Sequence, residues 1–169
     1  MPAHIAIIVD WYGPYSLGDT ITPARDDFGA GLYMAIGRKT SSKEDILQYV
    51  GISKNLASRL TTSQNLLHLN QGATVWLGEV STVGRIGAAT IKGMEQVALA
   101  EWLLAFYLQP KLNERKTTNP PSCVATLINR WWKTDYETPR RNRPHKDWPD
   151  IIDHGQEQIG FVKWVKVFE

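Results

Sequence analysis

Two short apolar segments joined by a polar turn constrain the fold of this chain more than any other feature. Residues 31–37 (GLYMAIG) and 46–52 (ILQYVGI) have the length and composition of β-strands, and the residues between them are polar. Strands joined by so short a turn are expected to pair antiparallel. A further strand is predicted at residues 74–83. The spacing of apolar residues then predicts a helix over residues 93–109, which Pro110 ends.

The two ends of the chain add weaker signals. Residues 5–12 and 159–168 have the β-branched and aromatic composition of strands, and Ser53 is expected to cap a short helix that runs through Leu60. The segments expected to be irregular are residues 13–29, 114–122 and 133–150, with residues 127–132 either a short helix or the start of a loop. This order of elements predicts an α+β fold rather than a doubly wound parallel sheet.

The composition fits one folded domain of 169 residues. Hydrophobic residues make up 43% of the chain, which is enough to bury a core. Charged residues make up 21%, a content that argues against disorder. A net charge of +2 excludes a strongly polybasic protein but allows a local basic patch. A single cysteine, Cys123, excludes an internal disulfide and a zinc cluster built on cysteines. No segment has the pattern of a signal peptide or of a membrane span, so a cytoplasmic protein is expected.

Four side chains are candidates for chemistry, and each has an ordinary alternative. Glu101 is a carboxylate on the otherwise apolar face of the predicted helix, so it lies either at the rim of the core or in a site where it binds a metal. Tyr33 and Tyr49 would meet if their strands pair, although tyrosines are common in sheets. Arg59 is either a surface residue or a contact to phosphate, whose oxygens match the planar guanidinium.

Taken together and in order, these residues resemble the GIY-YIG nuclease superfamily. Gly31-Leu32-Tyr33 is similar to the first half of its motif, and Tyr49-Val50-Gly51 is similar to the second half. Arg59, Glu101 and the element Pro110-Lys111-Leu112-Asn113 follow in the order of the family, with spacings that fit members similar to the excision-repair nuclease UvrC.

The resemblance implies a small antiparallel sheet of three core strands flanked by helices, with additional N-terminal and C-terminal strands. The core strands would be residues 31–37, 46–52 and 74–83. Within a single domain of residues 1–169, the nuclease core would span residues 28–115, and residues 116–169 would form a C-terminal extension.

The resemblance also implies an endonuclease that hydrolyses phosphodiester bonds with a divalent metal. Glu101 would hold Mg²⁺ or Mn²⁺, which polarises the scissile phosphate. Tyr33 would help to deprotonate the attacking water, with Tyr49 as the alternative base or as the group that orients the water. Arg59 would stabilise charge on the phosphate oxygens. Asn113 would position the glutamate helix or a loop through hydrogen bonds.

Two positions depart from the pattern of the family. Many members carry a histidine four residues after the arginine, where this chain has Ser63, and His68 is the candidate replacement. Members similar to UvrC often carry a lysine after the second glycine, where this chain has Ile52, and Lys54 or Lys39 are candidates to supply that charge. Both departures concern the group that activates the nucleophile.

A basic cluster lies outside the resemblance. Residues 139–146 (PRRNRPHK) place five basic residues in eight positions, with aromatic residues nearby, which suits contacts to phosphates and stacking on bases. The alternative is a solvated loop held on the core by tryptophans. The residues predicted to contact nucleic acid are Arg140, Arg141, Arg143 and Lys146, together with Arg59 and Lys54 of the core.

These observations predict a stand-alone endonuclease that acts on DNA, of the restriction, phage, mobile-element or defence kind. A nuclease that acts on RNA is an alternative, because the contacts to the 2′-hydroxyl that distinguish RNA are not visible in a sequence. A nucleic-acid-binding or regulatory protein on a degenerate scaffold is a second alternative. The presence of all five family residues favours the enzyme.

Overall fold

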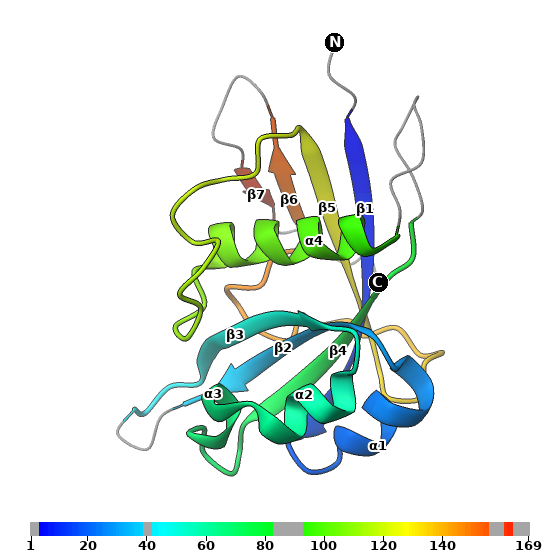
Figure 1. Ribbon diagram of the computed structural model, residues 1–169, viewed down its shortest axis with the longest axis vertical. Helices are drawn as coiled ribbons and strands as arrows, with labels where there is room; N and C mark the ends of the chain where they lie inside the picture. The colour runs from blue at the N-terminus through cyan, green and yellow to red at the C-terminus, as the bar shows by residue number, and fades with distance from the viewer. Residues whose placement is uncertain (1–3, 39–41, 83–92, 156–160, 164–169) are drawn as a thin grey trace.

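One mixed β-sheet forms the body of the molecule (Figure 1). The structure is a computed structural model that describes residues 4–38, 42–82, 93–155 and 161–163. In these residues the sheet has seven strands in the order β3-β2-β4-β1-β5-β6-β7. The strands are β1 (Ile5–Ser16), β2 (Gly31–Gly37), β3 (Ile46–Ser53), β4 (Thr74–Val80), β5 (Ala125–Trp132), β6 (Ile151–His154) and β7 (Phe161–Lys163). The helices are α1 (Ile21–Pro23), the π-helical turn η1 (Ala24–Phe28), α2 (Leu56–Thr62), α3 (Gln64–Leu67) and α4 (Gly93–Leu108).

The prediction of a small three-stranded antiparallel sheet flanked by helices is wrong. Strands β2, β3 and β4 do pair antiparallel, but β4 also pairs with the long strand β1, and β1 pairs in parallel with β5. The sheet is therefore a single mixed sheet, and most of its helices are short. The physical reason is that a three-stranded sheet would leave the backbone groups along the free edge of β4 unpaired, and β1 satisfies them.

Several segments at the ends of the chain also differ from expectation. Residues 125–132 form β5 rather than a helix or loop, because alternate residues are buried with the period of a strand. Strand β1 continues to Ser16, and α1 and η1 follow within the predicted loop. Strand β6 was not expected. Of the predicted strand over residues 159–168, residues 161–163 form β7 and the rest lies outside the described residues.

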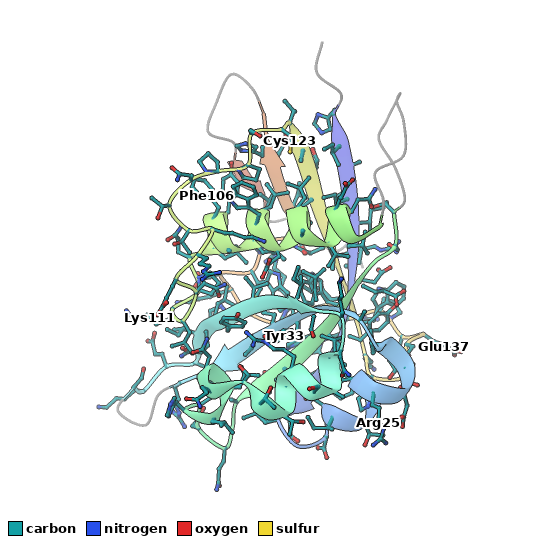
Figure 2. All side chains as sticks on the ribbon, viewed as in Figure 1. Arg25, Tyr33, Phe106, Lys111, Cys123 and Glu137 are labelled. Atoms are coloured by element: carbon teal, nitrogen blue, oxygen red, sulfur yellow. The ribbon has the colours of Figure 1, made fainter. Side chains whose placement is uncertain are left out.

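The two faces of the sheet carry two hydrophobic clusters. Helix α4 covers one face, where it packs on Trp11, Met34 and Val50. Helix α2 covers the other face beside Tyr33 and Leu77. Figure 2 shows the side chains that fill the space between α4 and the sheet. None of the helices in the described residues has the length and apolar composition needed to cross a membrane.

Tryptophans fasten the C-terminal part of the chain to this core. Trp148 is fully buried, and its ring centroid lies 4.7 Å from that of Trp11 and 4.7 Å from that of Trp131. Residues 133–150 form no helix or strand, as predicted, yet Trp148 fixes them to the sheet. The C-terminal extension therefore completes the same core and does not form a separate appendage.

Candidate functional site

The β2–β3 hairpin brings the two predicted tyrosines together. In the register of the hairpin Tyr33 lies opposite Gly51 and Tyr49 lies opposite Ala35, so the tyrosines are diagonal neighbours on one face. Their ring centroids are 5.6 Å apart. The prediction that the two side chains meet is confirmed, and they meet on the face that α2 covers.

Gly51 makes this arrangement possible. A Cβ atom at this position would lie 2.6 Å from Cε1 of Tyr49 and 2.9 Å from the hydroxyl oxygen of Tyr33. Any larger residue would push the two rings away from the strand. The glycine of the second half-motif is thus required by close packing of the tyrosines above it.

Helix α2 places Arg59 over the same face. The cap of this helix is Asn55, whose side-chain oxygen accepts a hydrogen bond of 3.0 Å from the backbone N–H of Ser58. The predicted cap, Ser53, is instead the last residue of β3. Arg59 follows one turn after the cap, and its Nε donates to the hydroxyl oxygen of Tyr33 at 3.2 Å.

The burial of Tyr33 weakens the prediction that it acts as the base. Its side chain is fully buried, and burial raises its pKa well above that of a free phenol. The neighbouring Tyr49 raises the pKa further, Arg59 lowers it, and the net result is a raised pKa. Tyr33 therefore keeps its proton at neutral pH and serves to hold Arg59. Tyr49 is only half-buried and lines a pocket.

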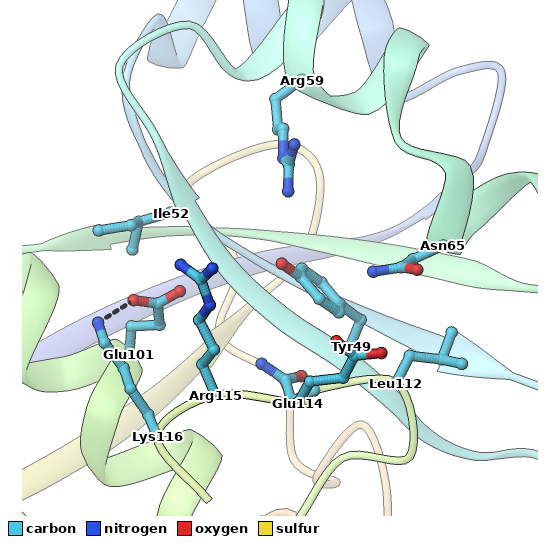
Figure 3. A pocket seen from close by; sticks show the side chains of 10 residues that line it. Tyr49, Ile52, Arg59, Asn65, Glu101, Leu112, Glu114, Arg115 and Lys116 are labelled. Atoms are coloured by element: carbon cyan, nitrogen blue, oxygen red, sulfur yellow. Dashed lines mark hydrogen bonds and ion pairs between the residues drawn. The ribbon is translucent and has the colours of Figure 1, made fainter.

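This pocket lies beside β3, the terminal strand of the sheet (Figure 3). It has a volume of about 450 Å³. Its lining residues are Tyr49, Ile52, Arg59, Asn65, Glu101, Leu112, Asn113, Glu114, Arg115 and Lys116. Tyr49 and Arg59 come from the α2 side, whereas Glu101 comes from α4 on the opposite side. An edge strand is the place where residues from both faces can reach one cavity.

Glu101 lies at the rim of the core and at the wall of the pocket. The fully buried face of α4 is formed by Ala100, Leu103 and Leu104, and the side chain of Glu101 is 14% exposed. Nζ of Lys116 lies 2.5 Å from Oε2 of Glu101. Sequence reasoning missed Lys116, which belongs to a loop and has a φ of +64° that no local pattern indicates.

Asn113 fastens the loop after α4 to the edge of β3. Its side-chain oxygen accepts a hydrogen bond from the backbone N–H of Val50, and its side-chain nitrogen donates to the carbonyl oxygen of the same residue, both at 2.9 Å. The backbone N–H of Leu112 also donates to the carbonyl oxygen of Gln48 at 2.7 Å. The prediction that Asn113 positions a loop by hydrogen bonds is confirmed.

Carboxylates are the side chains of this pocket that could hold a metal ion. The described residues contain no group of three or more His, Cys, Asp or Glu side chains arranged to hold a metal ion. Mg²⁺ often takes only one or two carboxylates from a protein, and Glu101 and Glu114 are the carboxylates that line this pocket. Because Nζ of Lys116 contacts the Glu101 carboxylate, this lysine must move before a metal binds there.

Of the residues proposed to replace missing family groups, the two that the structure describes are not in the pocket. Lys54 and His68 are exposed, and neither lines it. Lys39 lies outside the described residues. The cations that do line the pocket beside Arg59 are Arg115 and Lys116, which the sequence analysis did not select.

The basic cluster of residues 139–146 is partly committed to packing. The guanidinium carbon of Arg140 lies 5.1 Å from the centroid of the Trp76 ring, and Nε of Arg143 donates to Asp150 at 2.7 Å. Arg141 and Lys146 are exposed. Arg140 and Arg143, which were predicted to contact phosphates, therefore each have an internal partner.

Comparison of the chain with protein-family models, with curated proteins and with solved structures finds no match. A function must therefore be inferred from the residues of the pocket.

Proposed function

We propose that the pocket at the edge of β3 hydrolyses phosphodiester bonds of nucleic acid, DNA above all, with Mg²⁺ or Mn²⁺. One observation carries the proposal. Tyr49, Arg59 and Glu101 are far apart in the sequence and come from opposite faces of the sheet, yet they line one cavity of about 450 Å³. This hydroxyl, guanidinium and carboxylate are the groups that metal-assisted phosphoryl transfer uses.

Each group has a role that follows from its surroundings. Glu101 binds the metal, which when present polarises the phosphate and lowers the pKa of a bound water. Arg59 contacts the phosphate oxygens, and the hydrogen bond from its Nε to Tyr33 fixes the direction of its guanidinium. Tyr49 faces the pocket and orients the attacking water, whereas the buried Tyr33 positions Arg59.

The resemblance to GIY-YIG nucleases supports this proposal through the motif residues, whereas the fold that it implied differs from the observed sheet. Tyr49, Arg59, Glu101 and Asn113 line one pocket beside β3, and Tyr33 contacts Tyr49 and Arg59 from the neighbouring strand. The larger mixed sheet around them differs from the fold that the resemblance implied.

The contact between Lys116 and Glu101 favours a second candidate function. If the lysine permanently takes the place of the metal, the protein binds nucleic acid without cutting it. The geometry of the pocket would then serve to recognise a phosphate group only.

Cleavage assays distinguish the two candidates. The purified protein is incubated with supercoiled plasmid, linear duplex, single-stranded DNA and RNA, each with Mg²⁺, Mn²⁺ or EDTA. The proposal predicts cleavage that requires a metal and is lost in Arg59→Ala, which also serves as the control for a contaminating nuclease. Binding without cleavage under every condition would establish the second candidate and overturn the first.

A further inference from the structure

The loop that follows α4 is fastened on both sides of its exposed tip. On one side, Leu112 and Asn113 bond to the edge of β3. On the other side, Lys116 pairs with Glu101, and the carbonyl oxygen of Thr117 accepts a hydrogen bond of 2.8 Å from Nε2 of Gln109. The loop is thus held to a strand on one side of its tip and to a helix on the other.

Glu114 and Arg115 occupy the segment between the two sets of contacts. Both residues are exposed and both line the pocket. In Figure 3 the Arg115 side chain extends from the loop towards the space between Glu101 and Tyr49. The backbone that carries this side chain is therefore held in place on both sides.

The positive charge of Arg115 has no ion-pair partner within the described part of the chain. Lys116 differs, because its ammonium group contacts Glu101. Arg59 bonds through Nε to the neutral hydroxyl of Tyr33, so its charge is also not offset by a carboxylate in an ion pair. Two guanidinium groups from two different elements therefore border one pocket, and they favour an anionic ligand between them.

We propose that Arg115 is a second phosphate-binding residue of this pocket. Arg59 contacts the phosphodiester from the side of α2, and Arg115 contacts it from the side of the loop after α4. The planar fork of each guanidinium can donate two parallel hydrogen bonds to phosphate oxygens. This inference rests on the proposed function and extends it, because it assigns to the pocket a bound phosphodiester held between two arginines.

Binding measured without metal tests this inference apart from cleavage. A fluorescent oligonucleotide duplex is titrated with the wild-type protein in EDTA, where metal-dependent cutting does not occur. Arg115→Ala is expected to weaken binding by about 10-fold to 100-fold, the range for a hydrogen bond to a charged group. The slope of log affinity against log salt should fall by roughly 0.9 for each duplex phosphate contact that is lost.

Two further variants separate charge from geometry. Arg115→Lys keeps the charge but not the fork, so the salt slope should be retained while affinity falls in part. Lys111→Ala removes an exposed cation from the same loop, outside the lining of the pocket, and should change affinity less than twofold. If the unfolding curves of all variants coincide, the differences in affinity do not come from a loss of stability.

The outcomes separate this inference from the proposed function. If the wild type cuts DNA and Arg115→Ala binds and cuts equally well, Arg115 has no such role and the hydrolytic function stands. If the wild type never cuts but Arg115→Ala loses affinity and salt slope, the two-arginine site stands and hydrolysis is wrong. A wild type that neither binds nor cuts overturns both.

Discussion

The hydrogen bonds of Asn113 lead to a prediction whose size follows from the structure. Its amide makes two bonds of 2.9 Å to the backbone of Val50. Each such bond contributes about 0.5–1.5 kcal/mol to the free energy of unfolding. Asn113→Ala removes both, and water can partly replace them at the edge strand, so a loss of about 1–2 kcal/mol is expected.

Asn113→Asp should be more damaging than the alanine variant, although it is closer in shape. The aspartate can still accept from the N–H of Val50, but its second oxygen then faces the carbonyl oxygen of Val50, where the amide had donated. Two acceptors opposed at hydrogen-bond distance repel each other. We expect the aspartate variant to be less stable than the alanine variant by about 1 kcal/mol.

Urea unfolding followed by tryptophan fluorescence measures these differences. Asn142→Ala, an exposed asparagine elsewhere in the chain, is the matched control and should stay within about 0.5 kcal/mol of the wild type. Cleavage should fall in both Asn113 variants, because the loop they loosen carries Arg115. If Asn113→Asp is as stable as the wild type, the assigned contacts to Val50 are incorrect.

Three other predictions follow from single contacts. Gly51→Ala should displace the Tyr49 ring, lower the free energy of unfolding by about 1–3 kcal/mol and slow cleavage. Its control in urea unfolding is Gly155→Ala, because a Cβ atom at Gly155 would meet no atom within 4 Å. Burial raises the pKa of Tyr33, so the folded state holds the phenol proton more tightly than the unfolded state does. The free energy of unfolding should therefore decline as pH rises above about 10, and Tyr33→Phe should show a shallower decline in alkaline unfolding. Lys116→Met should bind Mn²⁺ more tightly in calorimetry, and equal affinity would show that the lysine does not compete with the metal.

The parts of this fold that sequence could predict are the local ones. Residues 31–37 and 46–53 pair as the expected hairpin, because a short turn and a run of strand-forming residues specify both partners. Helix α4 runs over residues 93–108, close to the predicted range, since a run of helix-forming residues and Pro110 define it locally. The meeting of the two tyrosines followed directly from that hairpin.

The missed parts depend on contacts between distant segments. Strand β1 pairs in parallel with β5, more than a hundred residues later, and neither segment carries a signal for its partner. The same limit applies to the site. Arg115 and Lys116 belong to an irregular loop, and contacts of this loop to distant segments, such as the bonds of Asn113 to β3, bring their side chains to the pocket.

The metal dependence of cleavage in a Glu101 variant tests the central claim most directly. Initial rates on duplex DNA are measured across a Mg²⁺ titration for the wild type, Glu101→Gln and Glu95→Gln. Glu95 is an exposed carboxylate in the first turn of the same helix, outside the lining of the pocket, so it controls for charge on α4. The wild type and Glu95→Gln should show the same rise in rate with Mg²⁺, and Glu101→Gln should be slower by about 100-fold or more at every concentration. Cleavage by Glu101→Gln at the wild-type rate in saturating Mg²⁺ would contradict the assignment of this pocket as a metal-dependent phosphodiesterase site.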